Sequence, residues 1–380
     1  RFNRNIRTFV IRGESSYGWW NLARKSFAEK HGYNKLIRSI YPEKAASLNS
    51  RRLLGNQSFD IAIDFDSYVM DNGQWIASSQ SAKTYNILHN DMWLEAEKTI
   101  NGKLKNPKTK RYVPFWSLFD TALSVSYATQ NINDIKLKKY INSSGVLTNI
   151  IDGDSIKLKA SQHIEYKNLN ISNMIEDVDM TNSSQITQAT FSEINQDIRK
   201  KSITTQGNTK PRIFITNSRL SPEKNLDNLI LAFVKLHETH SDIELQIFGN
   251  DVGHYASVLY NLVVQNNATD YIKFFGYSNN PYPAVQSADV FLLPSHTEGQ
   301  SIALMEAMVL KKDIIASNVA ANVELLKNGE FGLLTEGNDI QALYAALKLV
   351  ADGRYKKLKN FDYKEHNELV LKQFDNLFTK

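Results

Sequence analysis

The chain has 380 residues, a net charge of +5 and 42% hydrophobic residues, which fits a globular protein of two domains. It contains no cysteine, so disulfides and thiolate metal sites are excluded. No apolar stretch reaches the roughly 18 residues that a membrane-spanning helix needs, and the sequence has no nucleic-acid-binding motif.

Short apolar runs in the first half predict the strands of one domain. Because residue 1 is Arg, we expect the chain to be trimmed at its start. The absence of cysteine fits a cytosolic bacterial protein, and no signal peptide is visible at the start. We expect strands over residues 7–11, 59–65, 83–88, 122–125 and 146–150, and helices over 20–31 and 44–54.

The second half alternates strands and helices more regularly. We expect strands over 212–216, 244–248, 272–275, 290–293, 313–316 and 332–334, and helices over 226–240, 255–266, 301–310 and 340–352. This βαβα order predicts an α/β protein with two doubly wound domains. The expected division is a first domain over 1–152, a polar interdomain connection with an insertion over 153–210, a second domain over 211–360, and a helix over 361–380 that returns to the first domain.

Two carboxylates, Glu298 and Glu306, stand eight residues apart around a predicted strand-to-helix turn at Gly299. In open α/β sheets, ligands bind at the carboxyl ends of the strands, where this turn lies. The positive end of the helix favours an anion, and its first backbone N–H groups belong to Gln300, Ser301 and Ile302. An anion site with a carboxylate on each side suits a sugar nucleotide, which has hydroxyls on both sides of its phosphates.

A basic pair, Arg219 and Lys224, follows the first strand of the second half. Negative charge builds on a diphosphate leaving group as a sugar is transferred, and cations aimed at that group lower the barrier. A guanidinium binds phosphate bidentately, whereas an ammonium acts as a point charge. The alternative interpretation is a solvated basic turn in front of a helix.

These segments resemble the retaining glycosyltransferases of family 4 (glycosyl transferases group 1). The resemblance implies the GT-B fold, in which two doubly wound Rossmann-like domains face a cleft. The stretch from Glu298 to Glu306 is similar to the family's Glu-x7-Glu motif, and Ser218–Asn225 is similar to its Gly/Ser-Arg-Leu-x-x-x-Lys-Asn/Gly motif. Phe274–Tyr277 resembles its Phe-x-Gly strand end. The resemblance runs from about residue 212 to 349. The form Glu-Gly-Gln, where Glu-Gly-Phe is commoner, resembles bacterial enzymes that glycosylate teichoic-acid-like or capsular polymers.

The resemblance implies a role for each of these residues. Arg219 and Lys224 would hold the donor diphosphate, Glu306 would accept hydrogen bonds from the ribose hydroxyls, and Glu298 would hold the transferred sugar. Asn250, at another strand end, is a further donor-binding candidate. The implied enzyme is a hexosyltransferase that retains the anomeric configuration, uses a nucleotide-sugar donor such as a UDP-sugar, and needs neither a metal nor another cofactor.

His89 ends a strand of the first half, at a position similar to that of a family histidine near the donor sugar. We therefore take His89 as a candidate catalytic residue, with a structural histidine as the alternative. Weaker candidates are Asn90, Asp91 and His296. The family's first strand ends in a Gly-Gly loop; here Gly13 and Gly18 form a diverged version of it, or that unit lies outside the chain.

A basic run over 101–111 is the candidate acceptor site, and its lysines are Lys103, Lys105, Lys108 and Lys110. Such a run is usually a solvated loop, but it also suits an anionic glycan or a lipid-linked acceptor.

The leading functional hypothesis is a transferase that acts on a teichoic-acid-like, capsular or lipid-linked glycan of the bacterial envelope, with peripheral contact at the inner face of the membrane. The alternatives are a synthase with a small soluble sugar acceptor and a noncatalytic glycan- or nucleotide-binding partner of an active transferase. We expect no nucleic-acid partner. The oligomeric state stays open.

Overall fold

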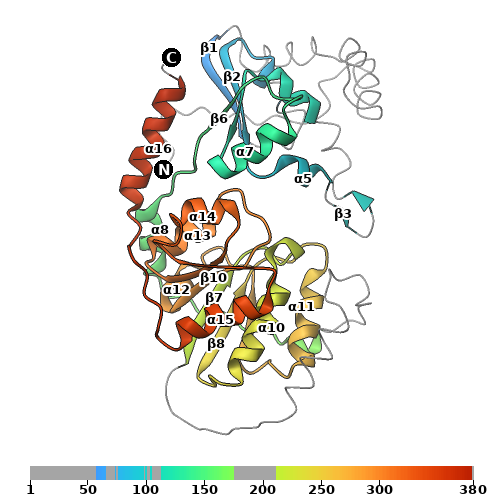
Figure 1. Ribbon diagram of the computed structural model, residues 1–380, viewed down its shortest axis with the longest axis vertical. Coiled ribbons are helices and arrows are strands. Elements are labelled where there is room, and N and C mark those ends of the chain that lie inside the picture. The colour runs from blue at the N-terminus through green and yellow to red at the C-terminus, as the bar shows by residue number, and fades with distance from the viewer. Residues whose placement is uncertain are drawn as a thin grey trace. The chain divides into compact units, whose positions relative to one another are not determined.

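The computed structural model describes residues 57–65, 73, 76–97, 99–100, 103–104, 113–174 and 211–378. The strand expected at 7–11, the helices expected at 20–31 and 44–54, and the loop with Gly13 and Gly18 lie outside these residues. The chain divides into two compact units, drawn in Figure 1. One comprises Arg1–Thr148 with Lys372–Lys380, and the other comprises Asn149–Leu371.

The first unit contains a four-stranded parallel sheet in the order β1-β2-β5-β6. Its strands are β1 (Phe59–Asp64), β2 (Ser81–Leu88), β5 (Thr121–Ser124) and β6 (Ser144–Val146). The described part of this unit also contains the helices α5 (Met92–Glu97) and α7 (Tyr127–Lys136) and a 3-10 helix over Val113–Leu118. β3 (Thr99–Ile100) pairs with β4 (Lys103–Leu104) in antiparallel fashion. The strands predicted at 59–65, 83–88 and 122–125 are confirmed.

The strand predicted at 146–150 is wrong in its extent, because the sheet pairing ends at Val146. The backbone beyond it bonds to α16 (Tyr363–Phe378) instead. Ile151 N–H donates to Asn367 Oδ1 at 3.0 Å, and Asn367 Nδ2 donates back to the Ile151 carbonyl at 2.8 Å. The side chain of Ile150 is 59% exposed, so an apolar residue there does not mark a buried strand.

The second unit contains a six-stranded parallel sheet in the order β12-β11-β10-β7-β8-β9. Its strands are β7 (Arg212–Asn217), β8 (Ile243–Phe248), β9 (Ile272–Gly276), β10 (Val290–Leu293), β11 (Asp313–Ser317) and β12 (Leu333–Thr335). All six predicted strands are confirmed to within a residue or two at each end. The order places the first strand, β7, beside the fourth, β10, which is the topological switch point of a Rossmann fold.

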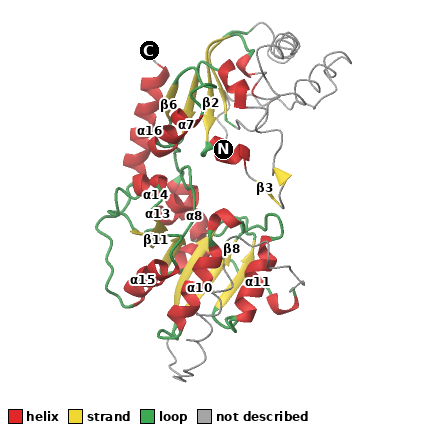
Figure 2. Ribbon diagram, turned by 45° about the vertical axis from the view of Figure 1, so that its right-hand side comes forward, coloured by secondary structure: helices red, strands yellow, loops and turns green. Residues whose placement is uncertain are grey.

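Helices cover both faces of this sheet (Figure 2). One face packs against α10 (Leu226–His237), α11 (Tyr255–Gln265) and α15 (Ile340–Ala351), and the other against α8 (Gly153–Ala160), α12 (Tyr282–Ser287), α13 (Ile302–Val309) and α14 (Ala320–Leu325). Successive strand residues alternate between the faces: Phe214 and Leu292 lie in the first core, and Ile215 and Leu293 in the second. The strands are therefore apolar on both sides, and for this reason the sequence predicted them as continuous apolar runs.

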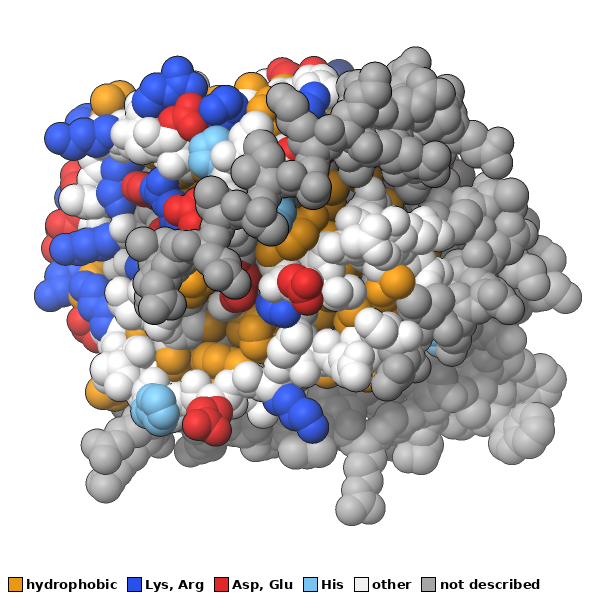
Figure 3. Space-filling model, turned by 90° about the horizontal axis from the view of Figure 1, so that it is seen from below, with side chains coloured by type: hydrophobic (Ala, Val, Ile, Leu, Met, Phe, Trp, Pro, Cys, Tyr) orange, Lys and Arg blue, Asp and Glu red, His pale blue; other side chains and the backbone are white. Residues whose placement is uncertain are grey.

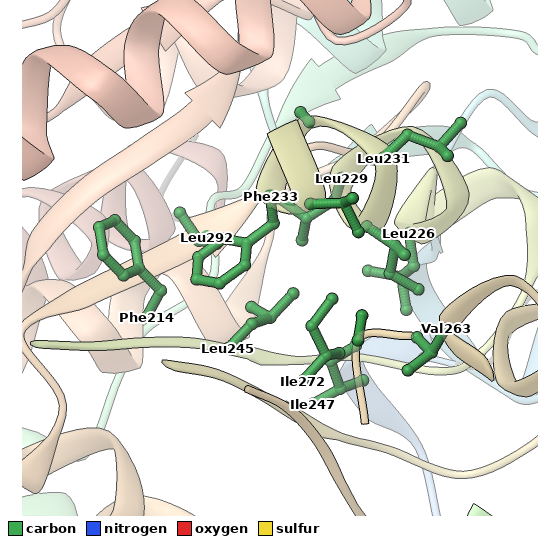
Figure 4. Close-up of a cluster of buried hydrophobic side chains, with 14 of the residues drawn as sticks. Phe214, Leu226, Leu229, Leu231, Phe233, Leu245, Ile247, Val263, Ile272 and Leu292 are labelled. Atoms are coloured by element: carbon green, nitrogen blue, oxygen red, sulfur yellow. The ribbon is translucent and has the colours of Figure 1, made fainter. Parts of the chain in front are cut away.

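The first of these cores is drawn in Figure 4, where Phe233 of α10 points toward Leu245 and Leu292 of the sheet. The rings of Phe214 and Phe233 meet edge to face, with their centroids 5.4 Å apart. This packing fixes α10 on β7, and the loop that joins them carries Arg219 and Lys224.

The segment expected as an interdomain connection with an insertion, 153–210, is described up to residue 174. It forms α8 and then follows the outer edge of β9, where Leu169 N–H donates to the Phe274 carbonyl at 2.7 Å. The expected C-terminal helix is α16, whose residues up to Leu371 belong to the second unit and whose last residues belong to the first. Among the described residues, no helix has the length and hydrophobicity to cross a membrane.

Charges of both signs are mixed on the surface. Figure 3 shows Lys and Arg side chains gathered along the left side of one face, interspersed with Asp and Glu. The ion pairs of the second unit include Lys359 with Glu330, at 2.7 Å, and Arg354 with Asp352, at 2.6 Å. Exposed pairs of this kind contribute about 0–1 kcal/mol each to stability.

Candidate active site

The loops after β7 and β10 meet at the switch point of the second sheet. The β7 loop runs through Ser218–Ser221 into a 3-10 turn, Pro222–Lys224, and the β10 loop runs from Pro294 to the start of α13. The His296 N–H donates to the Glu223 carbonyl at 2.9 Å and joins the two loops directly. The elements that carry both sequence motifs are therefore adjacent.

Lys224 and Glu298 form an ion pair across this junction. Lys224 Nζ lies 2.7 Å from Glu298 Oε1, and the two side chains are only 13% and 9% exposed. The ammonium has three donors, so it can hold the carboxylate and still donate to an anion. The structure thus brings together two residues that the sequence placed 74 positions apart.

Arg219 lies at the rim of the junction, with 53% of its side chain exposed. Its guanidinium contacts Glu223 Oε1 at 3.3 Å, which leaves most of its donors to solvent or to a ligand. The loop is held by the neighbouring strand end, where Leu220 N–H donates to the Asn250 carbonyl at 2.8 Å. Asn250 therefore supports the arginine loop through its backbone, while its residue is exposed at the same edge.

Two residues that the sequence analysis did not select fix these loops. Asn225 has a left-handed backbone (φ 56°), and its buried Nδ2 donates to the carbonyls of Pro294 at 2.9 Å and Gly337 at 2.6 Å. It therefore ties together the loops after β7, β10 and β12. A side chain at Gly249 would place its Cβ 1.8 Å from the Ser218 carbonyl oxygen, so only glycine fits there. The sequence signals were the Lys-Asn pair before a helix and a glycine directly after a strand.

Helix α13 begins at Ile302, and Ser301 caps it by accepting from the Leu304 N–H at 3.3 Å. Where the structure describes the chain, no acceptor is bonded to the backbone N–H groups of Gln300, Ser301 and Ile302. An N-terminus of this kind favours negative charge. It lies immediately after the loop that carries Glu298.

Glu306 lies on α13 and is partly buried. Its Oε1 accepts a hydrogen bond from the Tyr282 hydroxyl at 2.7 Å. Burial raises the pKa of Glu306, and the Tyr282 hydrogen bond and the positive charge of Lys159 act in the opposite direction. Burial and the bond to Glu306 together raise the pKa of Tyr282. The sequence carried no sign of Tyr282 or Lys159, since they come from two other helices.

Comparison with known proteins finds a family for the part of the chain that carries these residues. A family model described as glycosyl transferases group 1 matches residues 197–367. These residues belong to the glycosyl transferases group 1 family.

Two curated relatives are 30% identical to parts of this chain. One is an exopolysaccharide phosphotransferase of Streptomyces coelicolor, aligned over 172 residues, 43% of this chain and 18% of that protein. The other is the GtfA subunit of a UDP-N-acetylglucosamine–peptide N-acetylglucosaminyltransferase of Limosilactobacillus reuteri, aligned over 176 residues, 46% of this chain and 34% of that protein. The alignments thus span between about a fifth and a third of those relatives.

Solved structures resemble the chain over more of its length. Pneumococcal GtfA in complex with UDP and GlcNAc superposes with a TM-score of 0.57 at 18% identity, covering 89% of this chain and 60% of that one. HepE of Anabaena in complex with UDP gives 0.58 at 15% identity, covering 93% and 89%. The similarity is one of fold, and it confirms the predicted GT-B architecture of two Rossmann-like domains.

Within the glycosyl transferase region, the side chain of Gln300 accepts a hydrogen bond from the backbone of another segment. Its Oε1 accepts from the Asn149 N–H at 2.7 Å, and His366 Nε2 lies 2.9 Å from the Asn149 carbonyl. Gln300 thus anchors the segment that follows the first unit, and only its backbone N–H remains a donor-binding candidate. Gly299 is buried beside it, and His296 is exposed.

The remaining candidates belong to the first unit. His89 Nε2 is hydrogen-bonded to the Phe65 carbonyl. Asp91 caps α5 through the Leu94 N–H at 3.0 Å and pairs with Lys136, so its carboxylate has a structural role. The side chain of Lys103 and all of Lys105, Lys108 and Lys110 lie outside the described residues.

Metal ligands do not gather in the described part of the chain. No group of three or more His, Cys, Asp or Glu side chains there could hold a metal ion.

Proposed function

We propose that the chain is a retaining, metal-independent hexosyltransferase of family 4 that uses a nucleotide-sugar donor. The observation that carries this proposal is the buried Lys224–Glu298 pair at the switch point, with Glu306 on the helix that follows. It sets a cation, a helix N-terminus and two carboxylates around the place where α/β folds bind nucleotides. One relative is named for transfer from UDP-N-acetylglucosamine, and two of the resembling structures were solved with UDP.

In the proposed reaction, the bond between the anomeric carbon and the donor phosphate oxygen breaks as the charge on the diphosphate grows. Lys224 and Arg219 stabilise that charge, and the first N–H groups of α13 add preorganised donors. The acceptor hydroxyl forms the new bond on the same face of the sugar, and its proton passes to the departing phosphate oxygen. Glu298 holds hydroxyls of the transferred sugar, and Glu306 holds those of the ribose.

We further propose an acceptor among the anionic or lipid-linked glycans of the bacterial envelope. The Streptomyces relative is named for exopolysaccharide, and Staphylococcus aureus TarM, solved with α-GlcNAc-glycerol and UDP, superposes with a TM-score of 0.51 at 13% identity over 79% of this chain and 51% of that one. The basic run at 101–111 would bind such an acceptor, and the protein would work at the cytoplasmic face of the membrane, in peripheral contact with it. His89 is proposed to lie near the transferred sugar.

A noncatalytic partner subunit is the main alternative. A synthase with a small sugar acceptor is the other alternative, because sucrose-phosphate synthase superposes with a TM-score of 0.58 at 14% identity over 89% of this chain and 76% of that one. Isothermal calorimetry with UDP and with a panel of UDP-sugars, together with assays of UDP release, separates these cases. Lys224→Ala should abolish detectable binding of UDP, and Lys364→Ala, an exposed lysine on α16, should leave it unchanged. If no UDP is released from any donor, with or without acceptor glycans, the catalytic proposal is contradicted. Binding of UDP without its release from a donor would favour the partner role.

A further inference from the structure

Tyr282 stands at the start of α12, in the loop region after β9. Asn280 shapes this turn: its Oδ1 accepts from the Tyr282 N–H at 3.3 Å, and its Nδ2 donates to the Lys159 carbonyl of α8 at 3.1 Å. The Tyr282 ring is half-buried, and its hydroxyl points to Glu306 of α13. Three helices that are distant in sequence therefore converge on one carboxylate.

Lys159 approaches the same group from α8. Its Nζ lies 6.0 Å from the centre of the Tyr282 ring, and its charge acts on Glu306. The other charged side chains of α8 are directed elsewhere, because Asp154 accepts from the Tyr363 hydroxyl at 2.6 Å and Lys157 lies over the Tyr363 ring. β10, which also packs against α13, carries no titratable group. Among the described residues of α8, α12 and β10, Tyr282 and Lys159 are the side chains that act on Glu306.

We propose that Tyr282 is a positioning residue for Glu306: its hydroxyl holds Oε1 and leaves Oε2 to accept from the hydroxyls of the ligand's ribose. The inference rests on the proposed donor role of Glu306. Within the described residues, Tyr282 is the hydrogen-bonded partner of this carboxylate, and Oε2 has none. Without such a bond, the glutamate could rotate about its terminal torsion, which is broad for carboxylates. Binding of the ligand would then have to order the side chain, and this entropy cost would lower the affinity.

Tyr282 also keeps Glu306 an acceptor. A carboxylate accepts hydrogen bonds at both oxygens, whereas its protonated form donates at one of them. Burial raises the pKa of Glu306, and the Tyr282 bond lowers it, so removing the hydroxyl raises that pKa further. The affinity for a ribose diol is therefore lost at a higher pH in the absence of the hydroxyl than in its presence.

The test uses UDP and 2′-deoxy-UDP, with binding measured by calorimetry from pH 5 to pH 8. Tyr282→Phe removes one oxygen and keeps the ring. We expect it to weaken UDP binding about tenfold at neutral pH, the size of one hydrogen bond to a charged group, and to weaken 2′-deoxy-UDP much less. The acidic loss of UDP affinity should begin at a higher pH than in the parent. Tyr344→Phe is the matched control, because Lys235 Nζ lies 4.9 Å from the centre of that ring, in a site remote from Glu306.

The Glu306→Gln background separates the inference from the function on which it rests. If Tyr282 acts through Glu306, the Tyr282→Phe penalty disappears in that background. UDP affinity that is unchanged by Glu306→Gln would refute the donor role of Glu306 and the inference with it. If Glu306→Gln weakens UDP but Tyr282→Phe shifts neither the affinity nor the pH profile, the donor role stands and the positioning role is overturned.

Discussion

Neutralising Lys224 should destabilise the second unit through the carboxylate that it leaves behind. In Lys224→Met, the Glu298 carboxylate keeps its 9% exposure and loses the ammonium at 2.7 Å. Breaking a buried pair costs about 3–5 kcal/mol, and an exposed pair about 0–1 kcal/mol. The low exposure of both partners places this pair near the buried limit, so we expect about 3 kcal/mol. Lys224→Met/Glu298→Gln removes both charges, and its cost should fall short of the sum of the single variants by about 2 kcal/mol.

The assay is native-state amide hydrogen exchange read over residues 211–371. All five tryptophans lie before residue 117, so their fluorescence would report on the first unit. Lys359 and Glu330 give a matched control at the same distance, 2.7 Å, but with 64% and 41% exposure. A double-mutant cycle on Lys359 and Glu330 should give a coupling energy below about 1 kcal/mol. Equal couplings in the two cycles, or additive effects at Lys224 and Glu298, would refute the reasoning that burial makes the pair important.

Three further outcomes are expected. Arg219→Ala should lower kcat/KM about a hundredfold, because a charge-stabilising group is lost, while stability changes by less than about 1 kcal/mol, because the side chain is 53% exposed; a parallel fall in stability and activity would contradict a transition-state role. Gly249→Ala should cost more than about 2 kcal/mol of unfolding free energy in denaturant titrations, because its Cβ would lie 1.8 Å from the Ser218 carbonyl oxygen; a neutral substitution would show that the loop adapts. Transferase activity should survive dialysis against EDTA, and restoration of a lost activity by magnesium or manganese would point to another diphosphate site.

The sequence predicted the second sheet well because its strands are apolar on both faces. An apolar run such as Val290–Leu293 buries all of its side chains only in a sheet that is covered on both faces. The motifs at the ends of such strands then lie at the switch point. The ion pair between Lys224 and Glu298 was not predicted from the sequence. Its distance and burial could come only from the packed loops.

Other features depended on partners that the local pattern does not contain. Helix α7 is polar along most of its length, and its one local signal was Ser126, which caps it through the Thr129 N–H. The backbone at Ile151, beyond the end of β6, is bonded to Asn367, more than two hundred residues away. Tyr282 and Lys159 meet Glu306 only because α8 and α12 pack beside α13. Contacts of this kind follow from tertiary packing, which propensity and periodicity do not encode.

The central claim is that the switch point of the second sheet binds the donor nucleotide. A crystal structure of the chain with UDP tests it directly. We predict phosphate oxygens within hydrogen-bonding distance of Lys224 Nζ and of the first N–H groups of α13, and ribose hydroxyls at Glu306. UDP bound away from these residues, or a diphosphate that leaves the Lys224–Glu298 pair without contact, would contradict the account.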